Sequence, residues 1–376
     1  MRSLYLFLVL LVSVPFTALA NQELKLALIH TFSKPDPMCY DQRLNNLYNA
    51  VIMAWKDFKQ KNPNVKFDIS LNKYDYGGSK MLAADIMKDV DRDGAIAAIG
   101  YVCSDYALLG GRSAQQLKIP LITPTATDDE IENIGNYVYM SCFKNGYQGD
   151  ALARFAFKDL KRKKALVITA ADCSYCLSLA QTFKENFARL GGEIVGELNI
   201  LTSDSDFTEL VTKAKNFNFD TVFVPNYAMQ SAGIISAFLK NNLNQVFLGG
   251  DGWNWTDKMF DLVGSNEFVG YMTMSWIPEM QEKSSKDFVN RYQKMFNEQP
   301  LDIAAHSYDS AMIIFNSLKT ASALTREALA KAMSNLKTYS GITGNLVYNG
   351  KRSPRKSIVI VKLADNKQQF VKIVNP

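Results

Sequence analysis

Short apolar runs of strand length alternate with longer amphipathic runs of helix length along most of the chain. The strand-like runs are residues 24–29, 66–74, 95–100, 119–122, 137–142, 165–169, 193–200, 221–224 and 246–248. Residues 41–59 are typical of the helix-like runs, because Leu47, Val51 and Trp55 repeat on one helical face. This alternation predicts parallel sheets whose strands are connected by right-handed helical crossovers.

The pattern changes in the C-terminal part of the chain. Helix-like runs dominate residues 284–333, and two strand-like runs follow at 344–348 and 357–363, joined by a turn at 348–351. A tail of this size cannot build a third domain, so we expect it to return to the first two. The sequence therefore predicts an α/β fold with two doubly wound parallel-sheet lobes, a hinge and a cleft between facing strand ends.

The 376 residues are too many for one hydrophobic core, and they divide naturally into two lobes. We expect residues 21–142 to form lobe 1, completed by a return segment at 272–340. Lobe 2 is expected at 143–271, completed by residues 341–376.

Two neighbouring predicted strands end in turns that are rich in hydroxyl groups. Ser104 follows the strand at 95–100, and Thr125 and Thr127 follow the strand at 119–122. Ligands of open α/β sheets bind beyond the carboxyl ends of the strands, where helix N-termini attract anions. Each hydroxyl could instead be an ordinary helix N-cap. Their occurrence on two adjacent strands favours the rim of a binding site.

The N-terminus has the features of a secretory signal peptide. A positive charge at Arg2 precedes an apolar run at residues 4–14 and a small-residue ending at 18–20. The apolar run is shorter than the roughly 20 residues that a membrane-spanning helix needs. We expect cleavage after Ala20 and export of residues 21–376 to the periplasm.

Charge and composition argue against nucleic acid as a partner. The formal net charge is +5, and the basic residues are dispersed apart from short runs such as 161–164. Such runs usually solvate a surface. Five cysteines in an oxidising compartment suggest two disulfides and one remaining thiol.

Signs of catalysis are scarce. The only histidines, His30 and His306, lie in apolar surroundings, and the common nucleophile, zinc-protease and phosphate-loop motifs do not occur. We therefore expect no enzyme activity, no metal and no cofactor. The pair Cys173 and Cys176 allows two interpretations, a redox-active dithiol or a local structural disulfide.

Several segments, in their order and spacing, resemble a known family over essentially the whole mature chain. They are Gly100-Tyr101-Val102-Cys103-Ser104, residues 119–127, Gly249-Gly250-Asp251-Gly252-Trp253, Ser307-Tyr308-Asp309-Ser310-Ala311 and residues 341–345. Together they resemble the periplasmic branched-chain amino-acid or amide-binding proteins of ABC transporters. That resemblance implies the type I periplasmic binding protein fold.

The resemblance also implies a set of ligand-binding residues. Ser104, the backbone of Ala126 and Thr127 match positions that hold the α-carboxylate and ammonium of the ligand in the family. Asp251 matches an acidic residue of the second lobe that pairs with the ammonium, although a turn-forming role between glycines is the alternative. A carboxylate accepts from N–H and hydroxyl donors, and an ammonium donates to oxygen acceptors, which fits this division.

Three tyrosines match positions at which the family contacts the ligand. Tyr175 and Tyr227 lie on loops of the second lobe that often carry ligand-stacking tyrosines, and ordinary packing is the alternative for both. Tyr40 lies on a first-lobe loop that can cover the side chain of the ligand. That loop, residues 33–40, departs from the usual glycine-rich form, so the identity of the ligand is left open.

The family often pairs the cysteine before the binding serine with another cysteine after the second strand. This sequence has none there, so Cys103 is expected to pair with Cys39. Cys173 would then pair locally with Cys176, and Cys142 would remain free.

We therefore expect an extracytoplasmic, monomeric solute-binding protein. It would capture a small amino-acid-like or amide ligand between the lobes and deliver it to an ABC transporter permease. A ligand-sensing module that reports to a membrane receptor is the alternative, and an exported oxidoreductase using Cys173 and Cys176 is a minor one.

Overall fold

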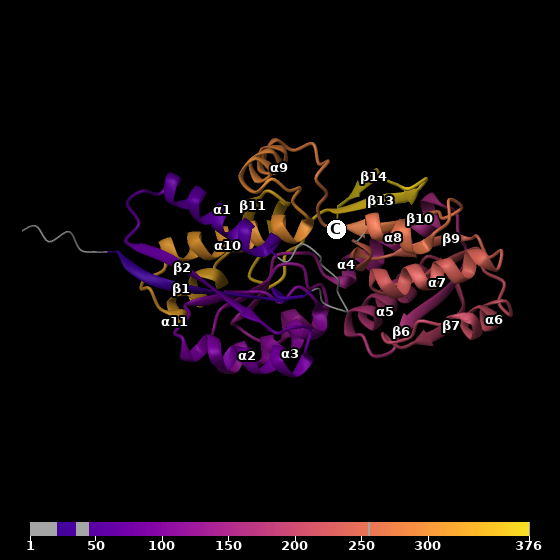
Figure 1. Cartoon of the computed structure of the whole chain (residues 1–376), viewed down its shortest axis with the longest axis horizontal. Helices are drawn as coiled ribbons and strands as arrows, with labels where there is room; N and C mark the ends of the chain where they lie inside the picture. Colours follow the sequence, from indigo (N-terminus) through magenta and orange to yellow (C-terminus); the bar gives the residue numbers. More distant parts are fainter. Residues whose placement is uncertain (1–20, 35–44, 255, 376) are drawn as a thin grey trace, which may run out of the picture.

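The computed structural model describes residues 21–34, 45–254 and 256–375. Two α/β lobes lie side by side along the long axis of the molecule (Figure 1). Tyr40 and Cys39 lie outside the described residues, as do the first 20 residues of the chain. The prediction of two sheet-based α/β lobes is confirmed.

The first lobe is built on a five-stranded, fully parallel sheet in the order β2-β1-β3-β4-β5. Its strands are β1 (Gln22–His30), β2 (Phe67–Asp75), β3 (Ala97–Ile99), β4 (Leu121–Thr123) and β5 (Val138–Met140). The strands β3 and β4 are buried at every position, because helices cover both faces of the sheet.

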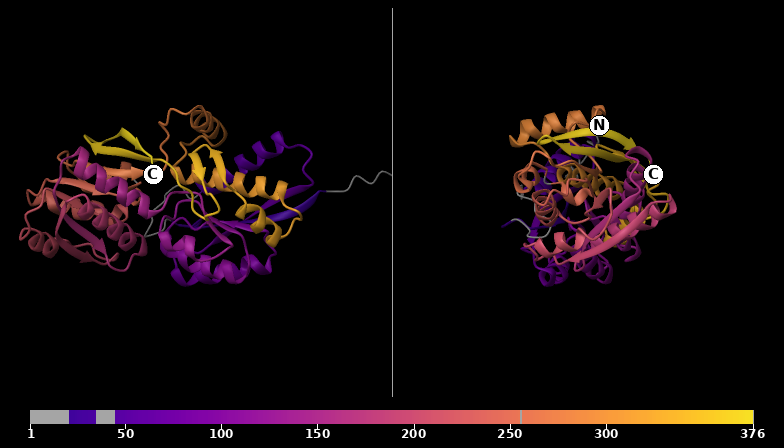
Figure 2. Two further views of the ribbon diagram at one scale, coloured as in Figure 1. Left: turned by 180° about the vertical axis from the view of Figure 1, so that it is seen from behind. Right: turned by 90° about the vertical axis from the view of Figure 1, so that its right-hand side faces the viewer.

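The helices of this lobe form two layers, one on each face of the sheet (Figures 1 and 2). One layer has α2 (Lys80–Arg92) and α3 (Ser104–Gln116), and the other has α1 (Asn46–Lys61), α9 (Lys283–Phe296), α10 (Asp302–Thr320) and α11 (Arg326–Ser334). Alternate residues of β1 serve the two layers. Ala27 and Ile29 pack in the core with α2 and α3, and Leu26 and Leu28 pack in the core with α1 and α10.

The second lobe contains a seven-stranded sheet in the order β14-β13-β10-β9-β8-β6-β7. Its strands are β6 (Lys164–Ala170), β7 (Glu193–Ile200), β8 (Thr221–Phe223), β9 (Val246–Gly249), β10 (Gly270–Met274), β13 (Ile358–Ala364) and β14 (Lys367–Val374). The helices are α4 (Asn145–Arg154), α5 (Ser174–Arg189), α6 (Thr208–Ala214), α7 (Ala228–Lys240) and α8 (Thr256–Val263). The strand β13 runs antiparallel to β10 and β14, so the expectation of a purely parallel sheet is wrong for this edge.

The chain passes between the lobes three times, after β5, after β10 and before β13. The helix α10 ties the first two passages together. Ser141 Oγ lies 2.7 Å from Ser310 Oγ, and the ring of His306 hydrogen-bonds to Ser275. These contacts hold the first two passages between the lobes against α10.

The C-terminal strands differ from the expected arrangement. The strand β12 (Gly344–Val347) pairs with β11 (Thr338–Gly341) in a separate hairpin, whereas β13 pairs with β14. The turn at 348–351 therefore connects two different sheets. The hairpin packs in the first lobe, since Leu346 belongs to the core that contains α1 and α10. The residue boundaries of the two lobes stay a prediction.

Candidate functional site

The first-lobe part of the candidate site lies where β3 and β4 end. Ser104 is the first residue of α3, and its hydroxyl oxygen accepts the backbone N–H groups of Thr127, at 3.2 Å, and Asp128, at 3.1 Å. All three residues are buried. Because the Ser104 oxygen already accepts two hydrogen bonds, its own O–H is the group left to donate. The two hydroxyl-rich turns therefore meet, as the sequence predicted.

Asp128 closes this turn. Its carboxylate accepts the N–H of Glu130 at 2.9 Å and so begins the short 3-10 helix Asp129–Asn133. Burial raises the pKa of Asp128 to about 6, although the Glu130 N–H lowers it. Nearby acidic groups add to the rise. The first-lobe rim thus ends in a buried, acidic turn.

The second-lobe part is organised around Asp251, directly beyond β9 in the short 3-10 helix Asp251–Trp253. Gln148 on α4 donates from Nε2 to Asp251 Oδ1 at 3.0 Å, and its Oε1 accepts the Asp251 N–H at 3.3 Å. The same Oε1 accepts the hydroxyl of Thr273 at 2.7 Å. Gln148 itself is fully buried, so this side chain fixes the position of Asp251.

The carboxylate of Asp251 has no cationic partner in the described part of the chain. Its hydrogen bonds come from the neutral side chains of Gln148 and Tyr175 and from backbone groups. Desolvation raises the pKa of Asp251 to about 6, even though these hydrogen bonds lower it. Asp251 is half-buried, and a desolvated carboxylate without a counter-ion is costly, so a ligand cation would relieve that cost.

Two tyrosines lie against each other beside Asp251. The rings of Tyr175 and Tyr227 stack, with centroids 4.9 Å apart and an interplanar angle of 24°. The hydroxyl of Tyr175 accepts the Gly252 N–H at 2.8 Å and also interacts with the Asp251 carboxylate. The structure therefore joins three of the sequence-predicted site residues, Tyr175, Tyr227 and Asp251, into one cluster.

A chain of hydrogen bonds connects the two parts of the site. The carbonyl of Thr127 accepts the Asn145 N–H at 2.7 Å, and Asn145 Oδ1 accepts Gln148 Nε2 at 2.7 Å. Gln148 then reaches Asp251. Sequence analysis missed Asn145 and Gln148, because neither lies in a distinctive motif. Both side chains are fully buried polar groups at the start of α4, but their burial depends on packing between elements, which no sequence pattern indicates.

The cysteines fall into three groups. Cys173 and Cys176 form a disulfide, which confirms the predicted local pair, and both are fully buried. Cys142 is free, as predicted, and donates from Sγ to the carbonyl of Ala126 at 3.0 Å. Burial raises the pKa of the Cys142 thiol, so it is a poor nucleophile. Cys103 is in a disulfide, but Cys39 lies outside the described residues, so their pairing stays a prediction.

Neither a metal centre nor a membrane-spanning helix is found in the described residues. No group of three or more His, Cys, Asp or Glu side chains there could hold a metal ion. None of the helices in this part of the chain is both long and apolar enough to cross a bilayer.

The profile of the periplasmic binding protein family matches residues 44–368. A relative from Brucella melitensis, named Leu/Ile/Val-binding protein homolog 3, is 25% identical over 260 residues, which cover 68% of this chain and 69% of the relative.

Solved structures show the same fold. The leucine-binding protein LivK from Thermotoga maritima superposes with a TM-score of 0.82 at 24% identity, covering 94% of this chain and 99% of that one. LivJ from Streptococcus pneumoniae, solved with isoleucine, gives a TM-score of 0.83 at 21% identity, covering 94% and 100%. At these identities the likeness concerns the fold, which is the predicted type I fold.

Proposed function

The chain belongs to the periplasmic binding protein family, and on that premise we propose that it captures a small amino-acid-like ligand between its lobes and delivers it to an ABC transporter. Its family consists of extracytoplasmic solute-binding proteins rather than enzymes.

Asp251 is the observation that carries the proposal. It is a desolvated carboxylate held in place by Gln148, and no cation pairs with it among the described residues. An ammonium group is the partner that such a site lacks, because it supplies both charge and hydrogen-bond donors. A ligand with only a carboxylate would instead be repelled.

The first lobe offers groups that suit the carboxylate of the ligand. Ser104 keeps its O–H for donation, and it lies at the N-terminus of α3, whose N-cap residue Cys103 makes no capping hydrogen bond with its side chain. The N-terminus of a helix favours a negative charge. A ligand carboxylate near Ser104 and a ligand ammonium between Thr127 and Asp251 would span the two lobes. This arrangement corresponds to a free α-amino acid.

Binding and closure are linked in this scheme. A ligand that contacts Ser104 on one lobe and Asp251 on the other gains its full set of contacts only when the lobes are together. It therefore binds the closed arrangement better and shifts the population toward it. A transporter that recognises the closed arrangement would then accept only the loaded protein.

The proposed function also requires export from the cytoplasm and a membrane partner. We propose export by the signal peptide at residues 1–20, with cleavage after Ala20, and action as a monomer with an ABC permease in the inner membrane. A sensing module of the same fold would bind the same ligand without supporting uptake. Ligand uptake by cells that lack the chain, measured with and without its return, separates transport from sensing.

A ligand screen tests the binding proposal. Wild-type protein is titrated calorimetrically with each of the free L-amino acids, with acetamide and with benzoate, which carries a carboxylate but no ammonium. We expect at least one amino acid to bind, and a hundredfold excess over its dissociation constant to stabilise the protein by about 2.7 kcal/mol. Binding of benzoate but of no amino acid would overturn the assignment of Asp251 as an ammonium partner.

A further inference from the structure

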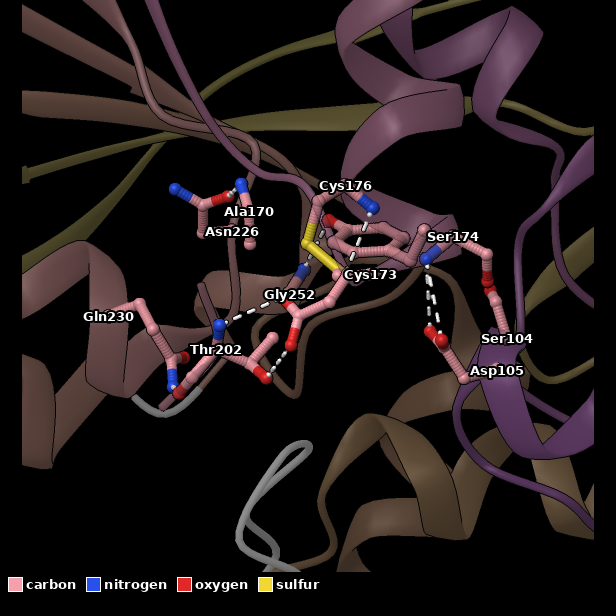
Figure 3. The surroundings of a disulfide bond; sticks show 12 residues. Ser104, Asp105, Ala170, Cys173, Ser174, Cys176, Thr202, Asn226, Gln230 and Gly252 are labelled. Atoms are coloured by element: carbon pink, nitrogen blue, oxygen red, sulfur yellow. Dashed lines mark hydrogen bonds between the residues drawn. A yellow bond between two sulfur atoms is a disulfide. The ribbon is translucent and has the colours of Figure 1, made fainter. Parts of the chain in front are cut away.

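A carboxylate of the first lobe binds the N-terminus of a helix in the second lobe. Asp105, in the first turn of α3, accepts the Ser174 N–H with both oxygens, at 3.2 and 3.4 Å. Ser174 is the first residue of α5. Figure 3 shows this pair of contacts between Asp105 and Ser174 at the start of α5. Asp105 is buried at this position.

The helix α5 needs this contact because its own cap is weak. Its N-cap residue is Cys173, whose sulfur accepts the Cys176 N–H at 3.2 Å. Sulfur is a weak acceptor compared with the oxygens of Ser, Thr, Asp and Asn, which are the preferred N-caps. The first N–H of the helix, at Ser174, is satisfied by Asp105 from the other lobe. A negative charge at that position also complements the dipole of α5.

Lys80 strengthens the same contact from the first lobe. Its ammonium lies 3.1 Å from Asp105 Oδ1 and 3.4 Å from the carbonyl oxygen of Asp172. It therefore also bridges the lobes. Asp172 is held in turn by Thr202, whose N–H and hydroxyl donate to its carboxylate at 2.8 and 2.6 Å. Lys80 therefore holds Asp105 from the first lobe, and Thr202 holds Asp172 from the second lobe.

The disulfide lies within this contact. Cys173 and Cys176 enclose Ser174, which receives Asp105, and Tyr175, whose hydroxyl lies against Asp251 and Gly252. One covalently closed turn therefore carries both a contact to the opposite lobe and a residue of the candidate ligand site.

We propose that Asp105 is a positioning residue for ligand binding: it caps α5 across the lobe boundary, and the Cys173–Cys176 disulfide holds the turn in the conformation that receives it. The contact joins the two lobes, so it stabilises the closed arrangement from the protein's side even before a ligand binds. The consequence for ligand affinity rests on the proposed function, but the cap itself does not. Losing the cap should increase the rate of ligand dissociation more than it slows association, because closure follows the first encounter.

Hydrogen exchange on ligand-free protein tests the cap without any ligand. Asp105→Ala removes the acceptor, Asp105→Asn keeps an acceptor oxygen and removes the charge, and Asp85→Ala is the matched control on an exposed aspartate of α2 that pairs with Lys88. We expect exchange in the peptide covering residues 172–178 to rise about 2- to 30-fold in Asp105→Ala, the range for loss of an N-cap. Asp105→Asn should recover most of the protection, and Asp85→Ala should match wild type.

Unchanged exchange at residues 172–178 in Asp105→Ala would overturn the proposal, and so would an equal rise in Asp85→Ala. The double variant Cys173→Ala/Cys176→Ala tests the disulfide, and it should raise exchange in the same peptide even with Asp105 present. Wild-type exchange there would refute the role of the disulfide.

The effect on binding is measured last, by stopped-flow dissociation of the amino acid found in the screen. Faster dissociation with nearly unchanged association is expected for Asp105→Ala. An equal loss in association would contradict a role in closure. Absence of any amino-acid ligand would count against the proposed function and leave the exchange result standing.

Discussion

Asp251→Asn should make the ligand-free protein more stable than wild type, and this difference in unfolding free energy should grow as the pH rises. The carboxylate is desolvated, which raises its pKa from 3.8 to about 6. An aspartate with a raised pKa in the folded state contributes full stability only below its unfolded pKa, and loses it as the pH rises through the folded pKa. At neutral pH the wild type therefore carries the cost of an ionised, unpaired carboxylate, and Asp251→Asn does not.

The magnitude follows from the size of the shift. A rise from 3.8 to about 6 corresponds to a cost of about 3 kcal/mol above pH 7, at 1.36 kcal/mol per unit. At pH 5 the carboxyl is mostly protonated in the folded state, and the same linkage gives a cost of about 1.6 kcal/mol. The stability difference between Asp251→Asn and wild type should therefore grow by about 1.4 kcal/mol between pH 5 and pH 7.5.

Guanidinium chloride unfolding of both proteins at pH 5 and pH 7.5 measures that growth. Any hydrogen bond that the amide makes less well than the carboxylate, such as the one with Tyr175, contributes at both pH values and cancels. Asp85→Asn, on an exposed aspartate of α2, is the matched control and should show no growth. A pH-independent difference for Asp251→Asn would refute the view that Asp251 is ionised and unpaired without ligand.

Three further changes have defined outcomes. Lys356→Met should stabilise the protein at pH 7 by up to about 3 kcal/mol. Burial lowers the pKa of Lys356 to about 8, so below that pH the folded protein carries the full free-energy cost of a buried ammonium. A loss of stability in chemical denaturation would contradict this. Gln148→Leu should destabilise the fold by roughly 2–5 kcal/mol, since it leaves the partners of a fully buried amide unsatisfied, and an unchanged melting temperature would count against it. Thr127→Ala should weaken amino-acid binding by about 1–3 kcal/mol in calorimetry, and its effect should be less than additive with Asp251→Asn because both residues would serve the same ligand ammonium.

The strand and helix alternation predicted most of the fold, because buried parallel strands are continuous apolar runs that stand out in a sequence. The edge strand β14 was missed, since its residues are mostly exposed and Phe370 and Ile373 lie on the surface. Its turn could have been recognised. Asp365 and Asn366 both adopt positive φ, which is the requirement of a tight two-residue hairpin.

The candidate site was predicted where its residues end strands and was missed where they depend on packing between elements. Ser104 and Thr127 follow β3 and β4, so their meeting could be inferred from the order of the strands. Gln148 lies on an amphipathic helix, and its approach to Asp251 depends on how α4 packs beside β9 and β10. The capping of α5 by Asp105 joins residues far apart in sequence, and no local pattern indicates it.

The central claim is that Asp251 holds the ammonium of a free amino acid between the lobes. Calorimetric titration of wild type and Asp251→Asn with the amino acid that binds in the screen and with the same compound lacking its amino group, such as L-leucine and 4-methylpentanoate, tests that claim most directly. We expect wild type to prefer the amino acid by at least about 2 kcal/mol, or roughly thirtyfold, and Asp251→Asn to lose most of that preference. Equal binding of the two compounds by wild type, or an unchanged preference in Asp251→Asn, would contradict the account.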